Sequence, residues 1–269
     1  MLRLQIINPD KMLKEIIHLS DIPSTNDYLM SLPTPAPDAM IIAVASHQTA
    51  GRGQGSNKWE SEDGKNLLFS ILTSPVSVPI AKQFVLSMAG ALALKHVLDR
   101  YTKDITLKWP NDIYWRDRKI SGTLIETSVV GKTLKRCIYG IGLNVNQNRF
   151  FSDAPNPVSL LNITRHETPL NLLLDDILQS FEHYYTLAIN GNHDAIVSQY
   201  NAALYRSSGF HAYKDVATGE EFDASIHHVG TDGLLHLVDN KGNNRIYSLK
   251  SRAGAEPPQA VGKDSSHRD

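Results

Sequence analysis

The chain has 269 residues, which is long enough to bury one sizeable core and to carry a smaller second module. Its 27 basic and 28 acidic residues leave a net charge of −1 without any lysine- or arginine-rich run, so composition argues against a DNA-binding surface. The N-terminal apolar run is too short for a signal peptide, and no segment is long and apolar enough to predict a membrane span. The one cysteine, Cys137, is typical of a buried thiol in a reducing cytoplasm.

A first strand is predicted at residues 16–19, followed by a helix that Ser24 or Thr25 caps and that runs to about residue 32. Further apolar and β-branched runs predict strands on both sides of a long helix over residues 80–101. These strands cover residues 40–46, 66–73, 105–108, 113–116, 120–130 and 134–146. Short turns between the later strands indicate a mixed, mostly antiparallel sheet backed by helices, which is an α+β fold.

The second part of the chain changes its pattern twice. Residues 155–169 are predicted to be a connector, and amphipathic patterns then predict helices over residues 170–189 and 194–205. From residue 209 to 250, short alternating runs separated by glycine-containing turns indicate a small barrel of hairpins. The predicted domains are therefore residues 1–205 and 206–250, followed by a disordered tail over residues 251–269 that is poor in large aliphatic side chains.

The segment after the second predicted strand carries three alternating glycines, Gly51, Gly53 and Gly55, around Arg52. Glycine lets the backbone take positive φ and bring N–H groups against a ligand, and the planar guanidinium of Arg52 can bind a carboxylate or a phosphate. Taken alone, the segment is as typical of a flexible surface turn as of an anion-binding loop. It matches neither the Walker loop nor the dinucleotide-binding fingerprint.

A second polar cluster, Lys108-Trp109-Pro110-Asn111-Asp112, follows another predicted strand, and Lys119 stands at the entrance of the next one. Each piece also has a purely structural explanation. The first is then a turn capped by Asn and Asp in which Lys108 pairs with Asp112, and the second is a solvated hairpin tip.

These pieces occur together and in one order, with Ser24-Thr25-Asn26 before them and Lys119-Ile120-Ser121-Gly122 and Gly140-Ile141-Gly142-Leu143-Asn144-Val145-Asn146 after them. On these motifs, residues 15–250 resemble a biotin protein ligase of the kind that modifies acetyl-CoA carboxylase. The resemblance implies a class II synthetase-like catalytic domain and a C-terminal SH3-like β-barrel. It also implies ATP and Mg²⁺ as cofactors, biotin as the substrate and a biotin carboxyl carrier domain as the protein partner.

The resemblance also bears on assembly and on DNA. A homodimer is one assembly that the family allows. Bifunctional relatives carry an N-terminal helix-turn-helix module, and here only about fifteen residues precede the catalytic half. We therefore expect a monofunctional ligase without repressor activity and without sequence-specific DNA binding.

Biotin presents a neutral ureido ring, an apolar bicycle and a carboxylate, so its site needs few but well-placed polar groups. The resemblance implies that this site consists of Ser24, Thr25, Asn26, Gln48, Gly51, Arg52, Lys119 and Gly122. Helix capping alone would also explain Ser24 and Thr25.

Activation of biotin brings its carboxylate against the α-phosphate of ATP, and two anions approach each other only where positive charge screens them. Arg52 and Lys119 are the predicted catalytic cations, with Asp112 as the third catalytic residue. Asp112 either holds a phosphate-bridged Mg²⁺ or orients the incoming lysine amine, and the sequence leaves both roles open. The resemblance implies that ATP or the adenylate contacts Gly53, Gln54, Trp59, Lys108, Asn111 and Asn144.

The sequence also gives expectations for Trp59, for Glu126 and for the glycine loop. Trp59 is either a wall for adenine or a buried anchor of the loop, Glu126 is structural, and the glycine loop closes over the acyl-adenylate to exclude water. Gln54, Gly55 and Ser56 stand where the family often has further arginines, which predicts weaker retention of the adenylate.

Two other functions are less consistent with the sequence than a ligase. A lipoate or octanoate transferase is disfavoured because the Arg-Arg-x-Ser-Gly-Gly-Gly loop of those enzymes is missing. A non-catalytic biotin-binding module is disfavoured because both catalytic cations are present.

Overall fold

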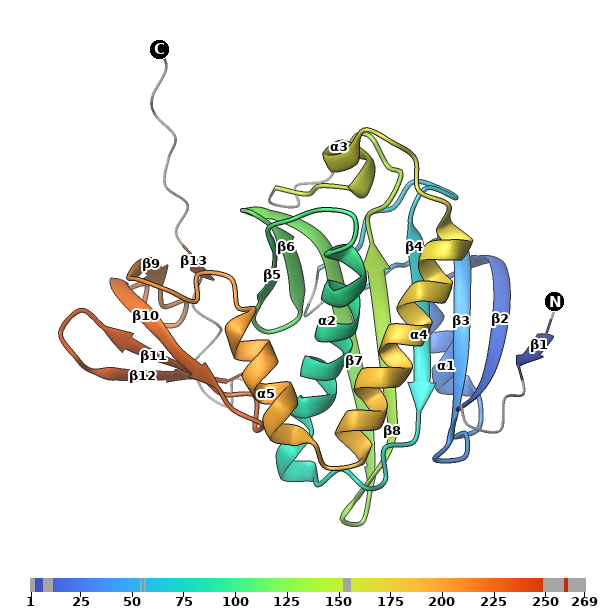
Figure 1. Cartoon of the computed structure of the whole chain (residues 1–269), viewed down its shortest axis with the longest axis horizontal. Coiled ribbons are helices and arrows are strands. Elements are labelled where there is room, and N and C mark those ends of the chain that lie inside the picture. The colour runs from blue at the N-terminus through green and yellow to red at the C-terminus, as the bar shows by residue number, and fades with distance from the viewer. Residues whose placement is uncertain are drawn as a thin grey trace.

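Eight strands form the main sheet of the computed structural model, within the residues that it describes: 3–6, 12–53, 55, 57–151, 156–248 and 259–260. They are β1 (Arg3–Ile6), β2 (Leu13–Ile22), β3 (Ala39–Gln48), β4 (Leu67–Thr73), β5 (Ile105–Lys108), β6 (Asp112–Trp115), β7 (Arg118–Val130) and β8 (Thr133–Leu143). Their order is β1-β2-β3-β4-β8-β7-β6-β5, in which β2 and β3 are parallel and the other neighbouring pairs are antiparallel. This confirms the predicted α+β class (Figure 1).

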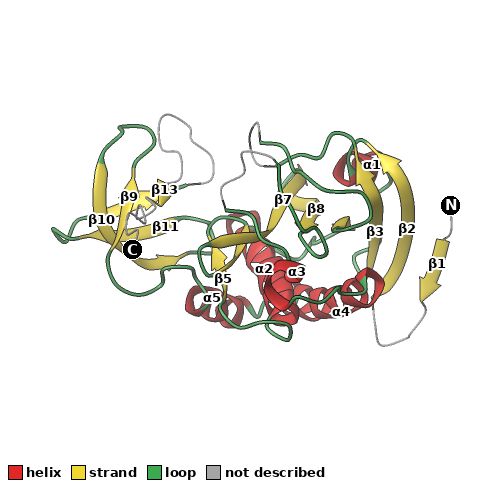
Figure 2. Ribbon diagram, turned by 90° about the horizontal axis from the view of Figure 1, so that it is seen from above, coloured by secondary structure: helices red, strands yellow, loops and turns green. Residues whose placement is uncertain are grey.

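Helices cover the two faces of this sheet unequally. The long helices α2 (Phe84–Leu98) and α4 (Leu170–Ile189) pack on one face, with α5 (His193–Ala202) beside α2, whereas the short helix α1 (Thr25–Ser31) packs on the other (Figure 2). β4 is buried along its whole length because its side chains meet helices on both faces. The space beside α1 on the less covered face is left for the site described below.

Two helices differ from the sequence prediction. The helix predicted over residues 80–101 is divided at Gln83 into a short 3-10 helix, η1 (Ile80–Lys82), and α2, which ends at Leu98. The predicted connector contains a further helix, α3 (Leu160–Thr164). Ser159 caps it by accepting from the Asn162 backbone while the Asn162 side chain accepts from Ser159, a reciprocal cap that its Ser-x-x-Asn spacing allows.

The C-terminal part forms a second antiparallel sheet, as predicted. Its strands are β9 (His211–Lys214), β10 (Glu221–Val229), β11 (Leu235–Asp239), β12 (Asn244–Tyr247) and β13 (Gln259–Ala260), in the order β12-β11-β10-β9-β13. β13 pairs with β9 inside the predicted tail, which the sequence did not indicate, and the rest of residues 251–269 lies outside the described residues.

The two sheets are joined by direct contacts. The Trp109 indole Nε1 donates to the Gly233 carbonyl at 3.1 Å, and the Phe84 amide donates to the Thr231 carbonyl at 3.2 Å. Gly233 has a φ of +84°, and a Cβ there would lie 2.9 Å from the Phe84 ring, so glycine is required for this close approach. The hydrophobic core accordingly continues from the first sheet into the second.

None of the described helices has the length and apolar character needed to cross a membrane.

Candidate functional site

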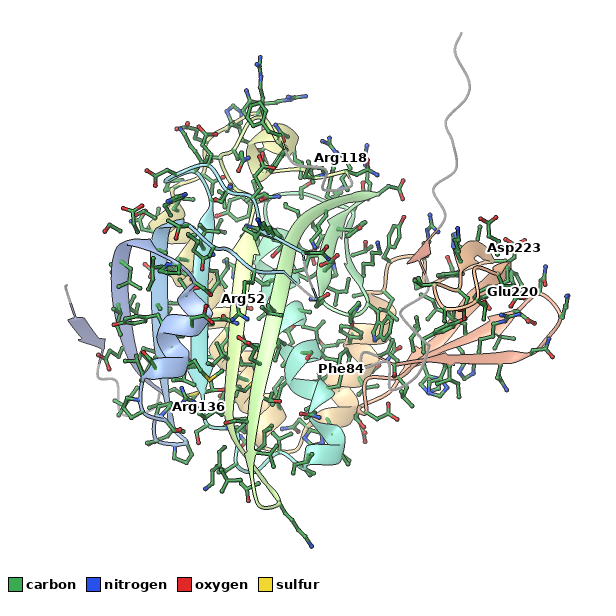
Figure 3. The ribbon with its side chains drawn as sticks, turned by 180° about the vertical axis from the view of Figure 1, so that it is seen from behind. Arg52, Phe84, Arg118, Arg136, Glu220 and Asp223 are labelled. Atoms are coloured by element: carbon green, nitrogen blue, oxygen red, sulfur yellow. The ribbon has the colours of Figure 1, made fainter. Side chains whose placement is uncertain are left out.

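A cavity of about 1130 Å³ lies between α1, residues 52–53 and 57–59, strands β5 to β8 and residues 205–223 of the C-terminal part. Arg52 lies on the sheet face opposite α2 and α4 (Figure 3). The cavity brings together most of the predicted site residues, namely Ser24, Thr25, Asn26, Gln48, Arg52, Gly53, Trp59, Lys108, Asn111, Asp112, Lys119 and Gly122. Gly51 and Asn144 do not line it, and Gln54 lies outside the described residues.

A chain of hydrogen bonds organises one end of this cavity. The Thr25 backbone amide donates to Gln48 Oε1 at 2.7 Å, and the Thr25 hydroxyl shares a hydrogen bond of 2.7 Å with the Ser70 hydroxyl. Ser70 Oγ in turn donates to Asn26 Oδ1 at 2.6 Å. Because Thr25, Asn26 and Ser70 are all buried, each contact fixes the orientation of a polar group that water does not reach. Ser24 does cap α1, by accepting from the Asp27 amide.

Ser70 is a residue that the sequence prediction missed. Its signal was present, since it is a polar residue in the middle of the apolar strand Leu67–Thr73. A buried hydroxyl normally needs a partner, but the sequence does not show which partners the neighbouring elements will supply.

We expect Ser70→Ala to raise the KM for biotin, the substrate that the resemblance implies, about tenfold and to lower the free energy of unfolding by about 1–2 kcal/mol, because Asn26 Oδ1 loses its buried donor. Steady-state kinetics and denaturant unfolding measure the two effects. Ser180→Ala is the matched control, since Ser180 is also buried, lies on α4 and has no hydrogen-bond partner for its hydroxyl among the described residues. A biotin KM that is the same in the Ser70→Ala and Ser180→Ala variants would exclude Ser70 from the site.

Arg52 is held by acidic residues at this end. Its Nη2 atom lies 2.6 Å from Asp27 Oδ1 and 3.3 Å from Glu126 Oε2, and the same Glu126 oxygen accepts from Asn26 Nδ2 at 2.8 Å. The Arg52 side chain is 43% exposed, so these pairs orient it more than they stabilise the fold. Glu126 therefore takes part in the polar network, which goes beyond the structural role predicted for it.

The two ends of the glycine-rich segment pair with each other as in a narrow hairpin. The Gly53 amide donates to the Asn57 carbonyl at 2.7 Å, and the Trp59 amide donates to the Gly51 carbonyl at 3.0 Å. Of the three glycines expected to allow a positive φ, Gly55 takes one, at +65°, whereas Gly51 and Gly53 do not. Gln54 and Ser56 lie outside the described residues, and closure over a ligand stays a prediction.

Trp59 and Asn26 occupy the space that glycines leave on β8. A Cβ on Gly142 would lie 2.3 Å from Trp59 Cε2, and a Cβ on Gly140 would lie 2.2 Å from Asn26 Oδ1. These two glycines therefore admit the side chains of Trp59 and Asn26. Trp59 Nε1 is buried and has no hydrogen-bond partner within the described ranges, so a donor is available at the cavity wall.

The charged end of the cavity contains an ion pair. Lys119 Nζ lies 2.7 Å from Asp112 Oδ1, with 29% and 20% of the two side chains exposed, so Lys119 is not a solvated hairpin tip. A one-residue irregularity in the pairing of β6 with β7 sets this geometry, because Ile113 faces Ser121 but Tyr114 already faces Lys119. The skipped residue turns Lys119 toward the same side as Gly122.

Lys108 has a different partner from the one considered in the sequence. Its Nζ donates to the Tyr114 hydroxyl at 2.8 Å instead of pairing with Asp112. Burial lowers the pKa of Lys108, and the Asp112 carboxylate acts in the opposite direction. Burial, assisted by Asp112, raises the pKa of Tyr114 to about 12, so this phenol stays protonated at neutral pH.

Two side chains that were predicted to contact ATP, those of Asn111 and Asn144, donate hydrogen bonds to backbone carbonyls instead. Asn111 Nδ2 donates to the Thr123 carbonyl at 2.6 Å, which ties the turn after Pro110 to β7. Asn144 is buried and donates to the Val158 carbonyl at 3.2 Å. A direct contact of either side chain with a nucleotide stays a prediction.

The described part of the chain contains no group of three or more His, Cys, Asp or Glu residues that could hold a metal ion. Asp112 is one of the carboxylates on the cavity wall. This fits Mg²⁺, which takes one or two protein carboxylates and completes its shell with substrate phosphates and water.

Comparisons with known proteins find similar sequences among protein ligases. Residues 19–144 match the biotin/lipoate A/B protein ligase family. A biotin–[acetyl-CoA-carboxylase] ligase of Mycobacterium tuberculosis is 30% identical over 189 residues, which are 67% of this chain and 68% of that protein. The bifunctional ligase/repressor BirA of Bacillus subtilis is 28% identical over 225 residues, 81% of this chain and 67% of that protein. The chain thus spans about two thirds of the length of both relatives.

A solved structure shares the fold. The biotin protein ligase of Aquifex aeolicus, determined in complex with biotin and ATP, superposes with a TM-score of 0.73 at 21% sequence identity. The superposition covers 91% of this chain and 99% of the Aquifex chain. The similarity in sequence and the shared fold lead to one conclusion: the chain belongs to the biotin protein ligase family.

Proposed function

We propose that this chain is a biotin protein ligase that uses Mg·ATP. The biotin carboxylate oxygen attacks the α-phosphorus of ATP, the bond between the α- and β-phosphates breaks, and biotinyl-5′-AMP and pyrophosphate are formed. The ε-amine of a lysine on a biotin carboxyl carrier domain then attacks the biotinyl carbonyl, releasing AMP and a proton. The observation that carries the proposal is one continuous cavity with a neutral, hydrogen-bonding end and a charged end.

The neutral end suits the biotin ring. Gln48, Thr25 and Asn26 offer donors and acceptors; Ser70 orients Thr25 and Asn26, and Thr25 orients Gln48. The bare strand surface at Gly140 and Gly142 lets Asn26 and Trp59 approach closely. A buried ureido group left without partners would cost about 1–3 kcal/mol per group, so such an arrangement favours this ring over an apolar one.

The charged end suits the reacting groups. Lys119 places an ammonium on the cavity wall, and Arg52 can turn toward an incoming carboxylate because it is half exposed. The Lys119 charge is in place before the reaction, so it stabilises the oxygens that gain negative charge in the transition state. Asp112 would hold Mg²⁺ against the phosphates, where the ion neutralises charge on the leaving group, or would orient the acceptor amine.

We expect the purified protein to catalyse biotin-dependent exchange of labelled pyrophosphate into ATP, and only with Mg²⁺ present. The exchange assay reads the first half-reaction without a protein acceptor. Lipoate is the matched control, because it is a carboxylic acid of similar length without a ureido ring. Exchange that is equal with lipoate and biotin would assign the chain to the lipoate branch of the family. Exchange with neither acid would contradict the proposed ligase activity.

A further inference from the structure

Two cations at one edge of the cavity lack carboxylate partners. Lys108 and Arg206 both line the cavity, and neither forms an ion pair with an acidic residue of the described part. Lys108 lies at the end of β5, whereas Arg206 lies in the turn between α5 and the C-terminal sheet. Arg206 was not among the site residues predicted from the sequence.

A pair of tyrosines supports the two cations. Lys108 Nζ lies 4.6 Å from the ring centre of Tyr114, and the Arg206 guanidinium lies 5.1 Å from the ring centre of Tyr205. The two rings are themselves 5.2 Å apart. Aromatic faces stabilise a cation without neutralising it, so both charges stay available to an anion.

Of the aspartates that line the cavity, Asp112 and Asp117 have other partners, and Asp223 lies on β10 opposite Ala212. Asp112 pairs with Lys119, and Asp117 accepts a hydrogen bond of 2.5 Å from the Tyr205 hydroxyl. Arg206 Nη1 donates a long hydrogen bond of 3.5 Å to the Ala212 carbonyl. Burial lowers the pKa of Lys108 and Arg206 lowers it further, against the effect of Asp112, which is the expected response of a cation to a like charge nearby.

The backbone holds Arg206 in this position. The Tyr205 amide donates to the Leu107 carbonyl at 2.8 Å, and the Leu107 amide donates to the Ala203 carbonyl at 2.9 Å. Residues 203–205 therefore lie alongside β5 and pair with it through a short parallel bridge. This pairing fixes Arg206 beside Lys108. Arg206 itself has a φ of +59°, a left-handed conformation that is unfavourable for arginine and persists only where its surroundings impose it.

We propose that Arg206, together with Lys108 on the tyrosine pair, forms the subsite for the β- and γ-phosphates of the nucleotide, which leave as pyrophosphate. The inference rests on the proposed function, because it assigns a place to the leaving group of that reaction. Two like charges held together at a partly buried edge repel each other until an anion lies between them. Guanidinium and ammonium groups are the donors that bind phosphate oxygens most strongly. Arg206 thus supplies a positive charge that the segment with Gln54, Gly55 and Ser56 lacks.

Direct binding of inorganic pyrophosphate with Mg²⁺, measured by titration calorimetry, tests the subsite without biotin and without turnover. We expect Arg206→Gln to raise the Kd of pyrophosphate, and that of ATP, at least about tenfold, and Arg206→Lys to restore part of the affinity. The Kd of AMP should change little, since AMP lacks the two distal phosphates.

The matched control is Arg116→Gln. Arg116 is also a left-handed arginine, with a φ of +53°, and its guanidinium lies 4.6 Å from the Trp115 ring centre, but it pairs with Asp104 and does not line the cavity. Its pyrophosphate Kd should stay within about twofold of the wild-type value. Equal effects of the two variants would make the role of Arg206 merely structural and overturn the inference.

The acceptor protein is the other possible source of an anion, and the transfer of biotin from preformed biotinyl-5′-AMP separates the two. If Arg206→Gln slows this transfer while pyrophosphate binding is unchanged, the arginine binds an acidic surface of the acceptor and the inference is wrong. Lack of pyrophosphate binding by the wild-type protein would also overturn it. Arg206-dependent pyrophosphate binding without biotin-dependent exchange would instead contradict the ligase activity and leave the subsite intact.

Discussion

Lys119→Ala should lower the turnover of biotin-dependent pyrophosphate exchange by about 100-fold or more, the usual effect of removing one preorganised donor from a developing negative charge. Lys119 reaches the cavity wall through the irregular pairing of β6 with β7, and its ammonium is held 2.7 Å from Asp112. The substitution removes the cation and leaves the Asp112 carboxylate facing the substrate anions, so both changes oppose the reaction.

The kinetic effect of this substitution should be separate from folding. Lys132→Ala is the matched control, because Lys132 lies in the turn at the other end of the same β7–β8 hairpin and is exposed. Thermal unfolding of both variants should resemble that of the wild-type protein. Near wild-type exchange by Lys119→Ala would show that the pair with Asp112 is only a surface contact.

Gly142→Ala should lower kcat/KM by about 10- to 100-fold, because overpacking costs about 1–3 kcal/mol. The added Cβ would lie 2.3 Å from Trp59 Cε2 and 2.7 Å from Trp59 Nε1, so the indole must leave the strand surface and carry the Gly51–Trp59 hairpin with it. The exchange assay and the Kd of biotin measure the loss.

A double-mutant cycle with Trp59→Ala identifies the cause of this loss. If the clash with the indole is responsible, adding Gly142→Ala to the Trp59→Ala protein should change activity by less than about twofold. An undiminished effect in that background would show that a methyl group at residue 142 blocks the ligand directly. It would also show that the close contact between Trp59 and β8 does not contribute to activity.

The local sequence pattern was sufficient to predict the helices and strands whose ends are marked by proline, glycine or polar turn residues. The helix predicted over residues 170–189 is found as Leu170–Ile189, since Pro169 precedes it and Asn190 and Gly191 end it. The strands around the glycine loop were predicted within two residues at most ends, because apolar runs bounded by polar turns allow few alternatives. The motifs likewise indicated most residues that line the cavity.

The parts that the sequence did not indicate depend on contacts between distant segments. The pairing irregularity that turns Lys119 toward Gly122 is decided by β6 and β7 together and leaves no mark in either strand. Ser70 joins the site because α1 brings Thr25 and Asn26, which are 45 and 44 residues away from it in the chain, over β4. Arg206 lies beside Lys108 through backbone pairing between residues 203–205 and β5. Such arrangements follow from tertiary packing, which propensity and periodicity do not encode.

The most direct test of the central claim is the intact mass of a purified biotin carboxyl carrier domain after incubation with this protein, biotin and Mg·ATP. We expect the domain to gain the mass of one biotinyl group on a single lysine, with no gain when ATP is omitted or when that lysine is replaced by arginine. An acceptor mass that stays unchanged with biotin, or that increases equally with lipoate, would contradict the assignment of this cavity to biotin activation and transfer.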